Sequence, residues 1–156
     1  MKKVIYIFAL VSTVFLIRCK KESILQPSRM DLLSERKWKI EKLLYSVKGD
    51  PTVLDYTSAL YKKCELDDIY EFKKGGSFIR SDGLNLCNSV ALYGPFGTSN
   101  WSADSAVTKL EIELFTRYSY KFKVVQLSAS QLQLERSTID YLQQEVLYTF
   151  YFQVAN

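Results

Sequence analysis

Residues 64–87 read CELDDIYEFKKGGSFIRSDGLNLC, and this stretch decides the fold. Alternate residues from Leu66 to Phe72 share one face of an extended strand. The pair Gly75-Gly76 follows, and glycines at such a point let the chain reverse direction. The stretch therefore predicts a β-hairpin that is bracketed by Cys64 and Cys87.

Alternation of apolar and polar residues recurs along the rest of the chain. Trp38 and Ile40 alternate with charged residues, and a slip of phase before Leu43 indicates a bulged strand over 37–47. After a long loop over 48–63, which we expect to act as a lid, and the hairpin, strands are predicted at 101–104, 109–114, 118–127, 131–136 and 145–154. Short strands with little helix are typical of a barrel or a sandwich. Because closure removes exposed edges, we expect an all-β, eight-stranded up-and-down antiparallel barrel.

The N-terminus has the pattern of a secretory signal. Lys2-Lys3 precedes the apolar run from Val4 to Ile17. Fourteen residues span only about 21 Å as a helix, which is too short for an ordinary bilayer-crossing segment. We therefore expect residues 1–18 to be a removable signal peptide.

Cys19, directly after this run, resembles the lipidated cysteine in the lipobox of bacterial lipoproteins, although Arg18 stands where that pattern has a small residue. Lys20-Lys21-Glu22 resembles the charged signals that send Bacteroidota lipoproteins to the outer face. The resemblance implies an outer-membrane lipoprotein of the cell envelope, exposed on its surface. We expect residues 19–31 to form a lipid-anchored tether and residues 32–156 the barrel domain. Within 30–35, a helical turn and a loop are both compatible with the pattern.

Charge and composition exclude several functional classes. The formal net charge is +4, but without Lys2, Lys3 and Arg18 the chain has 18 basic and 17 acidic residues. A balance so close to neutral argues against a nucleic-acid partner. The chain contains no histidine, the commonest general base and metal ligand. Its serines have no nucleophile-elbow motif, and the pair Glu111 and Glu113 fits the solvated face of a strand. We expect neither an enzyme nor a cofactor.

The order of the structural residues resembles the lipocalin-like domain of Bacteroidota lipoproteins over about residues 32–154. The residues that carry the resemblance are Trp38, Cys64, Asp67-Asp68, Tyr70-Glu71-Phe72, the glycine turn, Phe78, Gly83, Cys87, Trp101 and Leu110-x-Ile112. Arg36 and Asn100 depart from it where glycine is usual. The resemblance implies an eight-stranded meander barrel, an intradomain disulfide and a cavity for a small ligand.

Two local clusters contain residue types that are found in metal or redox sites. Cys64 and Cys87 are separated by 23 positions across the hairpin and, after export, meet an oxidising compartment, so we expect a disulfide. A zinc or redox pair would need a CxxC spacing or histidine partners. The acidic cluster at Glu65, Asp67 and Asp68 lacks the glycine-punctuated loop of a calcium site. We expect its aspartates to cap backbone amides, and we expect no metal site.

The inward aromatic residues are the remaining functional candidates. They can line an apolar pocket in which tyrosine hydroxyls orient a ligand. This predicts binding of a small hydrophobic molecule; an eight-stranded barrel can equally be filled by its own side chains. In that alternative the protein is a surface scaffold that binds partners through outward residues such as Leu147 and Tyr151. The candidate ligand-binding residues are Trp38, Tyr70, Trp101, Tyr120, Phe122, Tyr148 and Phe150.

Overall fold

The structure is a computed structural model that describes residues 26–87, 97–113 and 118–155. The predicted signal peptide and Cys19 lie outside these residues. The described elements are α2 (Arg29–Ser34), β1 (Lys37–Val47), β2 (Val53–Asp55), α3 (Thr57–Leu60), the 3₁₀ turn η2 (Lys63–Glu65), β3 (Ile69–Phe72), β4 (Ser77–Ser81), β5 (Gly97–Ala103), β6 (Lys109–Glu113), β7 (Ser119–Leu127), β8 (Gln131–Ile139) and β9 (Glu145–Val154).

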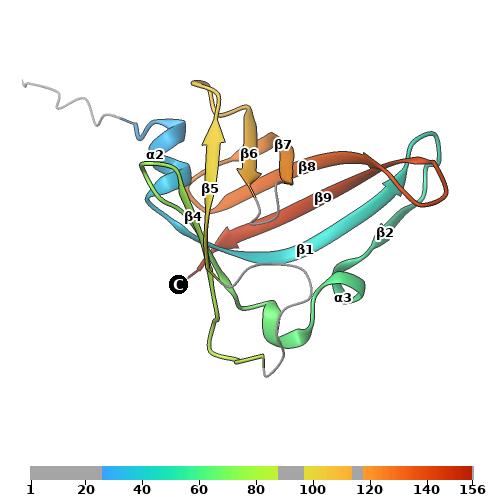
Figure 1. Ribbon diagram of the computed structural model, residues 1–156, viewed down its shortest axis with the longest axis horizontal. Coiled ribbons are helices and arrows are strands. Elements are labelled where there is room, and N and C mark those ends of the chain that lie inside the picture. Colours follow the sequence, from blue (N-terminus) through green and yellow to red (C-terminus); the bar gives the residue numbers. More distant parts are fainter. Residues whose placement is uncertain (1–25, 88–96, 114–117, 156) are drawn as a thin grey trace, which may run out of the picture.

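The strands form one antiparallel sheet in the order β2-β1-β3-β4-β5-β6-β7-β8-β9, and an additional β1–β9 pairing closes it (Figure 1). Eight strands, β1 and β3 to β9, make the barrel, and the predicted fold is confirmed. β2 is an extra strand within the predicted long loop, and it pairs with the second half of β1. The helical turn after it is α3.

The phase slip in β1 is a β-bulge, as its sequence predicted. The register against β9 shifts between Ile40 and Lys42, which leaves Glu41 as the extra residue. Trp38 and Ile40 before the bulge and Leu43 after it are all buried. The bulge therefore keeps two differently phased apolar stretches on the inner face of one long strand.

The hairpin of β3 and β4 forms as predicted, and the disulfide between Cys64 and Cys87 is present. Gly75 and Gly76 both have positive φ, which explains the two glycines at the reversal. Gly83 has a different role, because a Cβ there would lie 2.2 Å from the carbonyl oxygen of Asp67. The segments before β3 and after β4 thus approach each other too closely for any side chain at residue 83.

Helix α2 covers one end of the barrel. Leu33 is fully buried against the core, and its carbonyl accepts a hydrogen bond of 3.0 Å from the Trp38 indole nitrogen. Arg29 donates to the carbonyls of Ala106 and Val107 at 3.0 and 3.1 Å. Helix α2 begins at Arg29, within the segment 19–31 for which the sequence predicts a tether.

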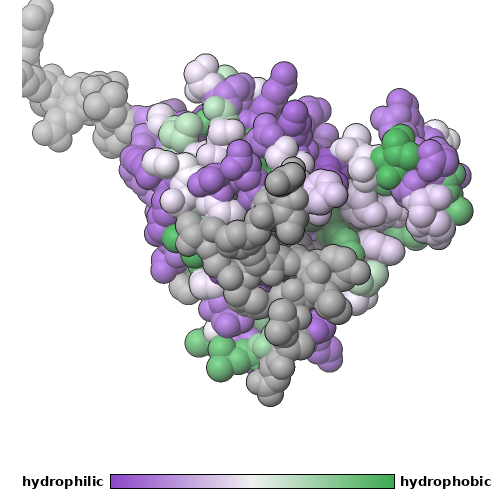
Figure 2. Space-filling view, viewed as in Figure 1, coloured by the Kyte–Doolittle hydropathy of each residue, from purple (hydrophilic) through white to green (hydrophobic). Residues whose placement is uncertain are grey.

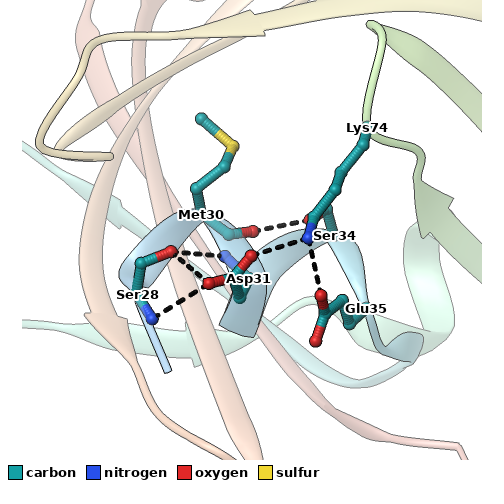
Figure 3. A network of polar contacts seen from close by, with 6 residues as sticks. All are labelled: Ser28, Met30, Asp31, Ser34, Glu35 and Lys74. Carbon is teal, nitrogen blue, oxygen red and sulfur yellow. Dashed lines mark hydrogen bonds and ion pairs between the residues drawn. The ribbon is translucent and has the colours of Figure 1, made fainter. Parts of the chain in front are cut away.

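A polar network fastens α2 to the β3–β4 turn (Figure 3). Ser28 and Asp31 cap the helix reciprocally, and the Lys74 ammonium lies 2.7 Å from Asp31 and 2.6 Å from Glu35. The hydrogen bond from Lys74 and those from Ser28 lower the pKa of Asp31 to about 2. All three ion-pairing side chains are solvent-exposed to a third or more, so this network positions the helix more than it stabilises the fold.

None of the helices in the described part of the chain is long and apolar enough to cross a membrane.

Candidate ligand-binding site

A cavity of about 590 Å³ occupies the barrel at the end away from α2. Residues 58–62, in and after α3, lie along it, whereas Leu33 and Trp38 at the α2 end do not. Figure 1 shows α2 and α3 on opposite sides of the barrel. The remaining lining residues come from β3, β4, β6, β7, β8, β9 and the η2 turn: Glu65, Tyr70, Phe72, Phe78, Arg80, Ile112, Tyr120, Phe122, Leu134, Arg136, Thr138, Tyr148, Phe150 and Phe152.

Nine of the nineteen residues that line the cavity are aromatic. Phe122 and Phe150 meet edge to face with ring centroids 5.7 Å apart, and Tyr70 meets Phe152 in the same way at 5.4 Å. Such contacts hold the rings in fixed orientations. The volume lies within the range of roughly 300–1,000 Å³ that is typical of small-molecule sites.

One polar cluster interrupts the aromatic wall. Arg80, on the inner face of β4, places Nε and an Nη atom 2.8 and 2.7 Å from the same oxygen of Asp68. Glu65 lies 3.6 Å from the guanidinium. All three residues are buried. Burial raises the pKa of Asp68, and the guanidinium opposes this shift.

Two tyrosines stand beside this cluster. Burial raises the pKa of Tyr61 to about 12, and burial likewise raises the pKa of Tyr70 well above its ordinary value. The guanidinium of Arg80 lies 5.5 Å from the centroid of the Tyr70 ring. Because both phenols stay protonated at neutral pH, they can donate hydrogen bonds to a ligand and are poor general bases.

A second guanidinium lines the cavity on β8. Arg136 is opposite Tyr148 in the β8–β9 ladder, and its guanidinium carbon lies 3.9 Å from the centroid of the Tyr120 ring. The last paired residues of the β7–β8 ladder at this end are Lys123 and Glu135. The contact between Arg136 and Tyr120 therefore lies just beyond the end of that ladder. The polar clusters of Arg80 and Arg136 thus sit on separate strands of the wall.

The structure places five of the seven predicted ligand-binding residues along the cavity: Tyr70, Tyr120, Phe122, Tyr148 and Phe150. Trp38 and Trp101 are buried elsewhere in the core. Trp38 lies under α2, and the Trp101 indole donates to the Lys73 carbonyl at 3.0 Å. Both tryptophans face inward as predicted, but at positions that the cavity does not reach.

Sequence reasoning missed Arg80 and Arg136, which both line the cavity. A signal for the two arginines was available. Arg80 lies two residues after Phe78, and Arg136 two residues after Leu134, so strand alternation puts each on the inward face. Segment 58–62 was correctly placed in the predicted lid loop, and the structure lays it along the cavity.

The expectation that the aspartates of the acidic cluster cap backbone amides holds for Asp67, whereas the Asp68 carboxylate pairs with Arg80. An Asp67 carboxylate oxygen accepts from the amides of Leu84 and Asn85 at 2.7 and 3.0 Å, and from the Asn85 side chain at 3.0 Å. Within residues 26–87, 97–113 and 118–155, no group of three or more Cys, Asp or Glu side chains is arranged to hold a metal ion.

The cavity is incompatible with the completely filled barrel that our alternative function assumed. On the outside, Leu147 and Tyr151 are partly buried, and the Lys42 ammonium lies 4.6 Å from the centroid of the Tyr151 ring. Apolar side chains are more exposed around the β8–β9 connection, at the right of the view, where Figure 2 shows a green patch. The exposed apolar residues of β2 and of the segment from the end of β8 to the start of β9 are Val53, Leu54, Ile139, Tyr141 and Leu142.

The chain matches no family model, and no curated protein matches it significantly. Several solved structures are similar to the chain at low sequence identity. Lobster apocrustacyanin A1 is 14% identical with a TM-score of 0.45, over 81% of this chain and 62% of that chain. Apocrustacyanin C2 is 12% identical with a TM-score of 0.45, over 80% and 61%.

A bovine odorant-binding protein in complex with a selenium-containing odorant is 13% identical, with a TM-score of 0.43, over 84% of this chain and 75% of that chain. The chain spans about three fifths of the length of the two crustacyanin proteins. At this level of similarity, the assignment of the barrel rests on the strand order and β1–β9 closure of the chain itself.

Proposed function

We propose that the domain binds a small, mainly apolar molecule inside the barrel, and that the chain is exported and anchored to the outer membrane through a lipid on Cys19. The cavity of about 590 Å³ with its aromatic wall is the observation that carries the binding role. Burial of an apolar ligand there is favourable by about 25 cal/mol for each Å² of apolar surface removed from water.

Filling the cavity should abolish this binding. Thr138 lines the cavity, whereas its neighbour Ser137 is exposed and does not. Because successive strand residues point to opposite faces, Thr138→Trp places an indole in the cavity and Ser137→Trp places the same group outside. Titration of each variant with the fluorescent apolar probe N-phenylnaphthylamine should show binding at least about tenfold weaker for Thr138→Trp, and unchanged for Ser137→Trp.

Circular dichroism of both variants serves as the control for folding. A wild-type protein that does not enhance the fluorescence of the probe, or equal weakening by the two substitutions, would refute binding inside the barrel. The first result would mean that the cavity takes no such ligand. The second would place the probe on the outer surface.

Lipid anchoring has a separate test. The chain purified from membranes of a lipoprotein-processing bacterium should have an intact mass that begins at Cys19 and includes a thioether-linked diacylglycerol. Arg18→Gly restores the small residue of the lipobox pattern, so it should raise the processed fraction, and Cys19→Ala should leave the chain without lipid. An unmodified wild-type chain, or one that begins at another residue, would contradict the proposal.

A further inference from the structure

Arg136 lines the cavity, and its guanidinium lies over an aromatic ring. It follows Leu132 and Leu134 on the inward face of β8, and both leucines are buried. Its guanidinium stacks on the Tyr120 ring at 3.9 Å. A cation over an aromatic face is attracted by the ring quadrupole, and the planar guanidinium keeps its edge available for hydrogen bonds while its face is stacked.

No carboxylate of the described chain neutralises this guanidinium. None of the ion pairs between described residues includes Arg136. The charge of Asp140 acts on the nearby Tyr148, but an oxygen of that carboxylate already accepts from the amides of Leu142 and Gln144 at 2.8 and 2.9 Å.

The other guanidinium of the cavity has a different environment. Arg80 lies between two carboxylates, those of Asp68 and Glu65. Carboxylates of the protein therefore balance the positive charge of Arg80. The positive charge of Arg136 remains available for a ligand. A stacked guanidinium at the edge of an apolar wall fits a ligand that has an anionic head and an apolar body.

We propose that the ligand is an apolar monocarboxylate whose carboxylate pairs with Arg136 and whose body lies against the aromatic wall. This inference rests on the proposed function, since it names the chemical class that the same cavity takes. A guanidinium can donate two parallel hydrogen bonds to one carboxylate. Fatty acids and aromatic acids share this chemistry.

The test uses matched acids and alcohols. Calorimetric titrations with dodecanoate and dodecanol, and with naphthoate and naphthalenemethanol, compare ligands of one body and two heads. Wild-type protein should bind each acid roughly ten- to a hundredfold more tightly than its alcohol, because the acid adds charge-assisted hydrogen bonds. The pair with the stronger binding distinguishes a fatty from an aromatic ligand.

Substitutions then assign the preference to one side chain. Arg136→Gln should reduce acid binding to the level of the alcohol and leave alcohol binding unchanged, while Arg136→Lys should retain part of the preference. Lys121→Gln is the matched control, because it removes one positive charge from an exposed residue of β7 that does not line the cavity. It should leave both affinities unchanged.

Each contrary result has a distinct meaning. Equal binding of acid and alcohol by wild-type protein would overturn this inference and leave the proposed function standing. A preference for acid that survives in Arg136→Gln would also overturn it, since another group would then hold the carboxylate. Absence of binding by all four compounds and by N-phenylnaphthylamine would overturn the proposed function itself.

Discussion

Substitution of Arg80 by methionine should lower the free energy of unfolding by about 3–5 kcal/mol, because it leaves buried carboxylates without their counter-ion. Asp68 is fully buried, and Arg80 supplies both of its close charged contacts, at 2.7 and 2.8 Å. Glu65, at 3.6 Å, loses the same partner. Urea denaturation at pH 7, with the disulfide intact, measures the loss.

Two variants separate this effect from a general loss of charge. Lys74→Met breaks the exposed pairs with Asp31 and Glu35 and should cost less than about 1 kcal/mol. The double variant Asp68→Asn/Arg80→Met removes both members of the buried pair, so it should recover part of the stability. If Arg80→Met and Lys74→Met lower the free energy of unfolding equally, the buried pair stabilises the fold no more than an exposed pair does.

The stability of the Arg80→Met variant should depend on pH in a defined direction. Burial already raises the pKa of Asp68, and loss of the guanidinium raises it further. Between the ordinary pKa of an aspartate and this raised value, the folded variant binds more protons than the unfolded chain. Its stability therefore falls as pH rises through that window, and the deficit relative to wild type should be smaller at pH 5 than at pH 7.

Removal of the disulfide should have the next largest effect. Cys64 and Cys87 are 23 residues apart, and closing a loop of that length stabilises a fold by about 3 kcal/mol in the chain-entropy model. We expect the double variant Cys64→Ala/Cys87→Ala to lose about this amount in guanidinium denaturation. Wild-type protein treated with dithiothreitol should lose the same amount.

Dithiothreitol should not change the stability of the double variant, and this serves as the control for other effects of the reductant. If reduced wild type and the double variant unfold at the same denaturant concentration as oxidised wild type, the bridge makes no net contribution. In that case the contacts of Asp67 with Leu84 and Asn85 would suffice to hold the hairpin ends together.

Two long strands were predictable to the residue, whereas β5 and β8 differ from their predicted bounds 101–104 and 131–136 by up to four residues. β9 extends from Glu145 to Val154 and the bulged β1 from Lys37 to Val47, both as their patterns indicated. β2 was not predictable, because its three residues are all exposed and therefore leave no apolar periodicity. Its place is determined by pairing with β1, which is a tertiary contact.

The candidate site was predictable in part, because strand alternation separates inward from outward side chains. Alternation tells which side of a strand faces inward, and this placed Tyr120 and Tyr148 correctly. It does not tell at which end of the barrel a side chain lies, so Trp38 was assigned to a cavity that it does not reach. A charged residue within an apolar stripe is usually exposed, and only a partner such as Asp68 makes the inward position of Arg80 favourable.

The edge of β1 that faces β3 has one further consequence. β3 pairs with it at Lys37 and Trp38, and β2 pairs with it from Leu44 to Ser46. Between these ladders, the backbone of Leu43 forms two hydrogen bonds of 2.8 Å with the segment that leads into α3. The Leu43 carbonyl accepts from the Tyr56 amide, and the Leu43 amide donates to the Thr57 hydroxyl. The stretch that seals this edge continues directly into residues 58–62, which form part of the cavity wall. A ligand that entered by displacing this stretch would remove part of the surface to which it binds. Substitutions in the stretch would then change the association rate and the affinity of the ligand together.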